Sequence, residues 1–162
     1  MSIQSIISIL DKLEKMHKSL LEHAYKKTEY VKKGDMQELD NMLKLEQSHV
    51  AAIETLEQQR QKMVTDYFRA KGIAHSDVPT VADVVEAAQS EEERNQLQAV
   101  RDRLMNTIEE LKRQNDLNQK LVFQSLQFVN MSLDLMRPRP EAQTMNYSSK
   151  EVRGTNNAAK KA

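Results

Sequence analysis

Apolar residues recur at spacings of three and four along most of the first 136 positions, which is the pattern of amphipathic helices. The pattern predicts one helix over residues 3–32 and a second over residues 36–71. Between them, basic residues suit a helix C-terminus, Gly34 suits a left-handed cap, and Asp35 can cap the next helix. A connection this short predicts that the two helices run antiparallel.

Two further helices are predicted before the chain changes character. Thr80 precedes a short apolar run with an acidic residue three positions later, close to capping-box spacing, and predicts a short helix over residues 80–89. Ser90 and the three Glu residues after it predict the start of a last helix over residues 91–136, because the helix dipole favours anions there. Pro138 cannot continue that helix.

The segment after the last helix has a different composition. Over residues 138–162, Ser, Thr, Asn, Lys and Gly dominate and bulky side chains are few, so we expect a disordered C-terminal tail. The predicted fold is therefore all-α. It is an elongated antiparallel three-helix bundle of long helices plus one short helix over residues 1–137, followed by the tail.

Composition narrows the classes of function. Lys+Arg and Asp+Glu balance at 24 each, so no basic field for nucleic acid is present, and cysteine is absent, which excludes disulfides and thiolate metal sites. The N-terminus lacks the basic region of a secretory signal, and no run reaches the ~18 apolar residues of a membrane span. We expect a cytoplasmic protein with no membrane insertion and no nucleic-acid partner.

The last helix changes character after residue 120. From 91 to 120 it carries one narrow apolar stripe, whereas from 121 to 136 apolar residues spread around most of the circumference. A surface helix in a thin bundle does not need so much apolar surface, so this segment is predicted to bind a partner. The residues expected to do so are Leu121, Val122, Leu126, Phe128, Val129, Met131, Leu133 and Met136.

Helix lengths support the same prediction. If the last helix runs back along the second, which is shorter, residues 128–136 should extend past the turn at Gly34. An uncovered apolar helix end predicts a surface for another protein or for a second copy of the chain. In the alternative, the short helix over 80–89 or a shift in register buries this end inside the monomer.

One local motif links this pattern to a known family. The segment LKRQNDLNQKLV contains Leu111, Asn115, Asn118 and Leu121, which resemble a Leu-and-Asn signature in the last helix of the flagellar type III export chaperones of the FlgN type. The arrangement of long helices, tight turn, short helix and polar tail is similar to that family over about residues 3–137.

The resemblance implies a chaperone that binds the C-terminal helical segments of flagellar hook-associated proteins, prevents their premature assembly and delivers them to the type III secretion apparatus. In that family the end of the last helix and the tail bind the client, and a tail tyrosine contacts the export gate. Carried over, residues 121–136 bind the client and Tyr147 contacts the gate. Family tails place Gly soon after that tyrosine, whereas Gly154 comes seven residues later here, so an inert Tyr147 stays an alternative.

Two Glu-x-x-His motifs raise the question of a di-iron site. The motifs begin at Glu14 and Glu46, and an antiparallel hairpin would set their histidines, His17 and His49, at one level. The last helix offers only amide side chains at that level, and these are poor iron ligands. We therefore predict no metal and no cofactor.

A polar layer is the alternative use of these residues. His17, Glu46 or His49 could join Asn115 and Asn118 and set the helix register, as a core Asn does in coiled coils, while exposed histidines are equally compatible with the sequence. No phosphate-binding loop or nucleophile elbow is present, so no enzyme is predicted. The second functional hypothesis is a structural coiled-coil protein that forms a homodimer through the same apolar helix end.

Overall fold

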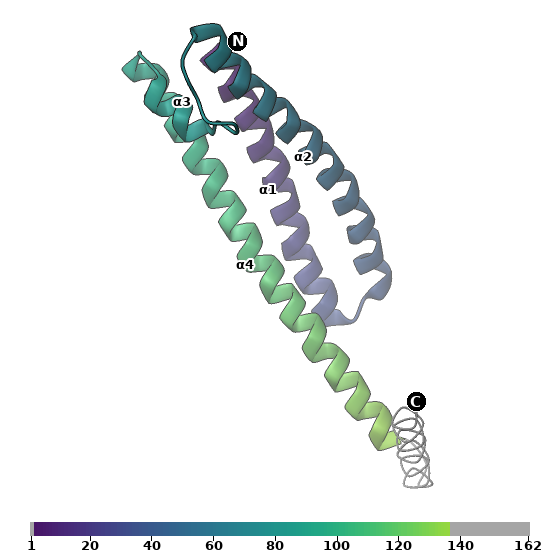
Figure 1. Cartoon of the computed structure of the whole chain (residues 1–162). Helices are drawn as coiled ribbons and strands as arrows, with labels where there is room; N and C mark the ends of the chain where they lie inside the picture. Colours follow the sequence, from purple (N-terminus) through teal and green to yellow (C-terminus); the bar gives the residue numbers. More distant parts are fainter. Residues whose placement is uncertain (1, 137–162) are drawn as a thin grey trace, which may run out of the picture. The chain divides into compact units, whose positions relative to one another are not determined.

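The computed structural model describes residues 2–136, except for the side chains of Phe128 and Val129, and this part contains four helices and no strand (Figure 1). Helix α1 spans Ile3–Lys33, α2 spans Met36–Lys71, α3 spans Val81–Ala87 and α4 spans Glu91–Met136. The predicted all-α fold is confirmed. The chain divides into two compact units between Val122 and Phe123, and each is described by itself.

The turn between α1 and α2 has the capping chemistry that the sequence predicts. Gly34 ends α1 in the left-handed conformation, with φ of 70°, and its N–H lies 3.2 Å from the carbonyl oxygen of Val31. Asp35 then caps α2, because its carboxylate accepts the backbone N–H of Glu38 at 3.2 Å. Basic residues occupy the last turn of α1, where the helix dipole favours cations.

Helix α3 is shorter than the predicted segment over 80–89. A full capping box between Thr80 and Asp83 starts it. Ala88 leaves the helical conformation, with ψ of 129°; its side chain is buried and its carbonyl oxygen accepts the guanidinium of Arg94 at 2.6 Å. The prediction was therefore too long at the C-terminal end.

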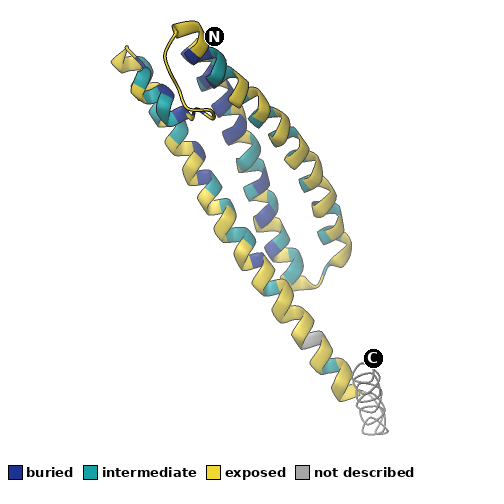
Figure 2. Cartoon of the chain, in the orientation of Figure 1, coloured by how far each residue is buried: buried dark blue, intermediate teal, exposed yellow. Residues whose placement is uncertain are grey.

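The apolar core of the first unit lies at one end of the hairpin. It joins the start of α1, the end of α2, α3 and the start of α4 (Figure 2). Burial of such side chains contributes roughly 1.5–3 kcal/mol each. The buried cluster consists of Ile3, Ile6, Leu10, Leu13, Val64, Tyr67, Phe68, Val81, Val84, Ala88, Leu97, Val100 and Leu104.

Helix α4 lies parallel to α1 within the first unit. Contacts between the two helices rise together in residue number, from Gln4 with Gln96, through Glu14 with Arg103, to Thr28 with Asn118. Because α1 and α2 form an antiparallel hairpin, α4 runs opposite to α2. The direction of the last helix, opposite to the second, is as expected in the first unit, and the contacts given place α4 on α1.

Candidate protein-binding surface

The apolar segment of α4, residues 121–136, exposes most of its described large apolar side chains. Leu121 is half-buried and Val122 is exposed at the end of the first unit. In the second unit the described large apolar side chains are between 50% and 85% exposed. These are Phe123, Leu126, Met131, Leu133, Leu135 and Met136.

The exposed apolar side chains occupy opposite sides of the helix. Successive residues turn by about 100°, so Leu126 and Leu133 lie on one side and Leu135 lies on the other. Asp134 is the one charged residue between 121 and 136 in the sequence. An exposed apolar surface with so little charge has the composition of the centre of a protein–protein interface.

The structure also bears on the alternative that this segment is buried inside the monomer. Helix α3 places Val81 and Val84 in the core of the first unit, while the described large apolar side chains from Phe123 to Met136 are exposed. The choice between a partner surface and burial inside the monomer stays a prediction, because it depends on how the two units are placed relative to one another. That residues 128–136 extend past the turn at Gly34 also stays a prediction, because it depends on where the second unit lies relative to the first.

The structure describes no side chain for three of the predicted site residues. The side chains of Phe128 and Val129 are not described, although their backbone belongs to α4. Tyr147 lies beyond residue 136. Their predicted roles stay predictions.

Asn118, one of the two asparagines of the family motif, lies in a polar layer, as the sequence analysis considered, but its partners differ from those expected. Its side chain is buried, its Nδ2 donates to the carbonyl oxygen of Ala24 at 2.8 Å, and its Oδ1 accepts the hydroxyl of Thr28. Gln114 in turn donates to that hydroxyl oxygen. A polar layer therefore joins α4 to α1, through partners that sequence analysis missed.

The other residues expected in the polar layer are arranged differently. His17 contacts the carbonyl oxygen of Leu13 in its own helix, at 2.7 Å. Asn115 is partly buried and its Oδ1 has no hydrogen-bond partner, while Leu111 is half-buried on the same side of α4. This contact of the His17 ring lies within α1, and the place of His17 in the layer stays a prediction.

The two Glu-x-x-His motifs do not converge on a shared site. Glu46 forms an ion pair with Lys27 at 2.8 Å. His49 contacts the hydroxyl of Ser19 at 2.9 Å, and its ring packs edge to face on His23 with centroids 4.9 Å apart. Within residues 2–136, no group of three or more potential ligands is placed to hold a metal ion.

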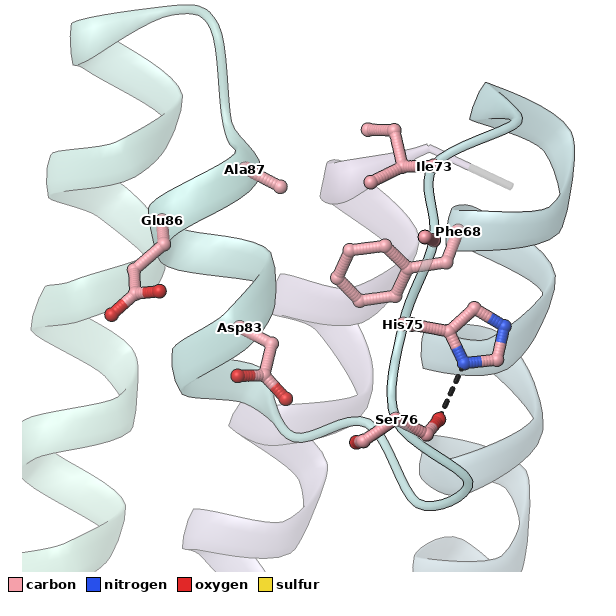
Figure 3. A pocket seen from close by; sticks show the side chains of 8 residues that line it. Phe68, Ile73, His75, Ser76, Asp83, Glu86 and Ala87 are labelled. Carbon is pink, nitrogen blue, oxygen red and sulfur yellow. Dashed lines mark hydrogen bonds between the residues drawn. The ribbon is translucent and has the colours of Figure 1, made fainter.

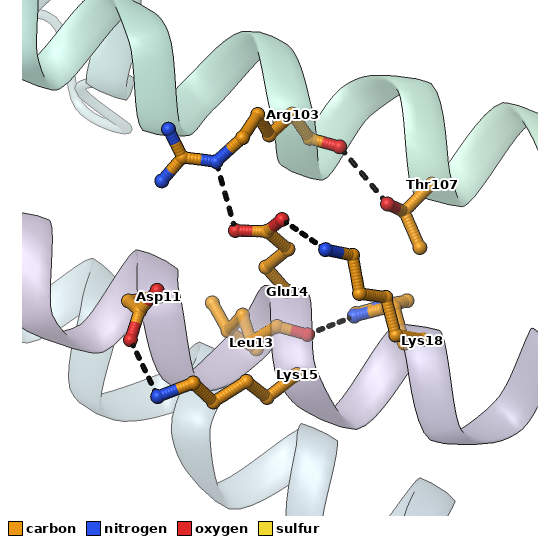
Figure 4. Close-up of polar contacts among 8 residues, drawn as sticks. Asp11, Leu13, Glu14, Lys15, Lys18, Arg103 and Thr107 are labelled. Atoms are coloured by element: carbon orange, nitrogen blue, oxygen red, sulfur yellow. Dashed lines mark hydrogen bonds and ion pairs between the residues drawn. The ribbon is translucent and has the colours of Figure 1, made fainter.

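Glu14 is buried at the boundary between the apolar core and the polar layer, and it uses its carboxylate to join two helices. Its oxygens accept Lys18 Nζ at 2.9 Å and Arg103 Nε at 3.3 Å, and both contacts can be followed in Figure 4. Burial raises the pKa of this carboxyl, but the two hydrogen bonds outweigh that effect, and the pKa lies below its usual value. The residue therefore stays ionised and links α1 to α4.

One hollow could in principle hold a small molecule. It lies between the end of α2, the following loop and α3. It has a volume of about 360 Å³ and is lined by Phe68, His75, Asp83 and neighbouring residues (Figure 3). Asp83 is already held in the capping box, and His75 contacts the backbone carbonyl of Ser76 at 2.6 Å, not its hydroxyl. This geometry does not pair a nucleophile with a base.

None of the helices in residues 2–136 is long and apolar enough to cross a membrane. The long helices, the polar layer and the exposed apolar helix end together are typical of helical proteins that bind other proteins. The sequence model of the FlgN protein family matches residues 1–152. The chain therefore belongs to the FlgN family, the family of flagellar export chaperones, which act in flagellum assembly and type III protein export.

A bacterial relative covers nearly the whole chain. The "Uncharacterized protein YvyG" of Bacillus subtilis (strain 168) is 31% identical over 148 residues, which are 91% of this chain and 88% of that protein. No solved structure matches this chain significantly. The family resemblance predicted from the sequence is confirmed, and the family is one of chaperones, not of enzymes.

Proposed function

We propose that this chain is a cytoplasmic chaperone that binds the terminal helical segment of flagellar hook-associated proteins through residues 121–136. It prevents their premature assembly and delivers them to the flagellar type III secretion apparatus. The observation that carries the proposal is the exposure of the apolar side chains between Phe123 and Met136, in a segment with a single charged residue. Membership of the FlgN family supports an export chaperone, and the choice of hook-associated proteins as clients rests on the family resemblance.

The mechanism is the mutual burial of two apolar helix surfaces. A client's terminal helix that normally packs against other subunits exposes its apolar side before assembly. Packing this side on α4 removes both surfaces from water, which contributes roughly 25 cal/mol per Å² of apolar area. Because Leu126 and Leu135 face opposite sides of α4, the client is expected to contact more than one side. No nucleotide is needed.

The test uses the full chain and the C-terminal segment of a hook-associated protein from the same organism. The double variant Leu126→Asp/Leu133→Asp places two charges on one apolar side, and we expect the Kd for the client to rise at least about 100-fold. Phe128→Asp or Val129→Asp should act in the same direction. The control Gln124→Asp/Gln127→Asp adds equal charge at exposed polar positions of the same segment.

Circular dichroism shows whether each variant keeps its helices. If the Leu126→Asp/Leu133→Asp variant is as helical as the wild type and binds the client equally well, the apolar segment is not the client site. If the glutamine control loses binding to the same extent, added charge and not loss of apolar contact is responsible. Either result contradicts the proposal.

We also propose that Tyr147 contacts the export gate, which rests on the family resemblance. In a pull-down with the export apparatus, Tyr147→Ala should lose the apparatus and keep the client. Equal capture of the apparatus by Tyr147→Ala and wild type would identify Tyr147 as an inert tail residue. A matched deletion of residues 148–162 separates the tyrosine from the rest of the tail.

Self-association through the same segment is the second candidate function. It is favoured by Leu126 and Leu133, which are exposed and stand seven residues apart on one side of α4, as in a coiled-coil seam. Analytical ultracentrifugation separates the two candidates. A tight homodimer that Leu126→Asp/Leu133→Asp dissociates, together with no binding of hook-associated proteins, favours the structural role.

A further inference from the structure

A second exposed apolar surface lies on the first half of α2, within the first unit. Met36, Leu43 and Val50 are 69%, 45% and 47% exposed and stand seven residues apart. Seven residues are nearly two helical turns, with a drift of only ~20° per repeat, so the three side chains form one line along the helix. We call these three residues the α2 ridge.

The interior beside the ridge contains a buried ion pair as well as apolar side chains such as Met42 and Ala24. At this level the ion pair between Lys27 and Glu46 is mostly buried, with side chains only 14% and 19% exposed. Farther along α2, Val64 and Phe68 are buried in the core. Figure 2 shows the half of α2 near the turn as mostly exposed. The chain's own core therefore gives no reason for an apolar line here.

The surroundings of the ridge are acidic. From residue 36 to residue 57 the sequence carries five acidic side chains, and Lys44 is the one Lys or Arg. Asp40 and Glu54 each stand four residues after a ridge residue, so they lie beside the ridge on the helix surface. The acidic side chains are Glu38, Asp40, Glu46, Glu54 and Glu57.

Some of these carboxylates already form ion pairs within α2, which limits their attraction for the cations of a partner. Asp40 lies 3.2 Å from Lys44, and Glu57 pairs with Arg60. Exposed ion pairs of this kind are worth about 0–1 kcal/mol, so a partner's cations can compete for them at little cost. The carboxylates of Asp40 and Glu54 beside the ridge favour a partner with positive charge.

We propose that the α2 ridge docks an amphipathic helix of a partner protein, with apolar residues at seven-residue intervals and Lys or Arg on both flanks. The apolar residues pack between Met36, Leu43 and Val50, as in a coiled-coil seam, and the flanking cations meet the carboxylates beside the ridge. This surface shares no residue with the client segment of α4. It therefore adds a second partner class to the proposed function.

The probe is a labelled helical peptide of about 21 residues with Leu at the seam positions and Lys at the flanking positions. Its binding to the full chain is followed by fluorescence anisotropy. We expect binding that weakens as salt is raised, and no binding of a matched peptide with Glu in place of Lys. Leu43→Glu/Val50→Glu should weaken binding of the Lys peptide at least about 10-fold.

A control variant separates the ridge from general surface charge. Leu45→Glu/Ser48→Glu adds the same two charges on the other side of α2, where Leu45 is 44% exposed, and should bind the Lys peptide like the wild type. Equal binding to the ridge variant and the wild type overturns the proposal, as does equal binding of the Glu peptide. A homodimer that the ridge substitutions dissociate would assign the ridge to self-association and also overturn it.

The same peptide distinguishes this proposal from the proposed function. The Leu126→Asp/Leu133→Asp variant should keep the Lys peptide while losing the client. If that variant loses the peptide and the ridge variant keeps it, the peptide binds at the client segment and the ridge proposal is wrong. Loss of client binding by itself leaves the ridge unaffected.

Discussion

The buried carboxylate of Glu14 on α1 lies 3.3 Å from the Nε of Arg103 on α4, and it also accepts Lys18 at 2.9 Å. Glu14 is 4% exposed, whereas the Arg103 side chain is more than half exposed. The pair therefore holds α4 on α1 at the edge of the apolar core, with water close to one partner. Its net contribution is expected to be modest.

Glu14→Gln should lower the free energy of unfolding by about 1 kcal/mol at neutral pH, because the hydrogen bonds lose their charge. The pKa of Glu14 is lowered in the folded state, so its stabilisation is present above the unfolded pKa of about 4.3 and is lost as pH falls through the folded pKa. Urea unfolding at pH 6, 4 and 3 measures this. Glu14→Gln should reduce the acid loss, and an unchanged loss would contradict this role for Glu14.

Protonation of His23 at acidic pH should also weaken the contact between α1 and α2, where the His23 ring packs on His49. The Nδ1 of His23 is buried without a partner, and burial first, then His49 and Lys26, lower the pKa of the ring. The unfolded chain therefore binds a proton more readily, and stability falls as pH drops below about 6.5 toward the folded pKa.

Urea unfolding at pH 7.5 and 5.5 tests this prediction. His23→Leu should lose less stability between these two pH values than the wild type. His75→Gln, in the exposed loop, is the control for removal of one histidine. If His23→Leu loses as much free energy of unfolding between pH 7.5 and 5.5 as the wild type, other groups cause the pH dependence.

Asn118→Ala should lower the free energy of unfolding by about 1 kcal/mol, because it removes two buried hydrogen bonds between α4 and α1, one to the carbonyl of Ala24 and one from the hydroxyl of Thr28. Thermal unfolding followed by circular dichroism measures the change. Asn106→Ala, at an exposed position of the same helix, should have little effect. Equal melting temperatures for the two variants would show that the polar layer contributes no stability.

Gly34→Ala should destabilise the turn between α1 and α2 by about 1 kcal/mol. The cost is that of the backbone conformation, because Gly34 has φ of 70°, which residues with a Cβ rarely adopt. A steric clash is not the cause, since an added Cβ would meet nothing within 4 Å. Gly34→Asn should cost less, since Asn tolerates the left-handed region better. Chemical denaturation of both variants tests the ranking, and an alanine variant as stable as the wild type would show that the turn adopts another conformation.

The helix bounds were predictable because their signals are local. Helices α2 and α4 span the predicted ranges 36–71 and 91–136, since Asp35 caps the first and Ser90 precedes the second. Helix α3 was predicted too long because no Gly or Pro follows Ala87 to mark its C-terminus in the sequence. The apolar spread from residue 121 onward was also visible in the sequence, because a helix with one covered side needs only one stripe.

The sequence by itself determined the helices, their caps and the apolar character of residues 121–136, because periodicity and capping involve residues three or four apart. Only the tertiary structure decided that Thr28 and Gln114 join Asn118, and that Glu14 pairs with Arg103. These pairs are separated by up to 90 residues. Their contact depends on the axial register of α4 against α1, which no spacing within either helix encodes.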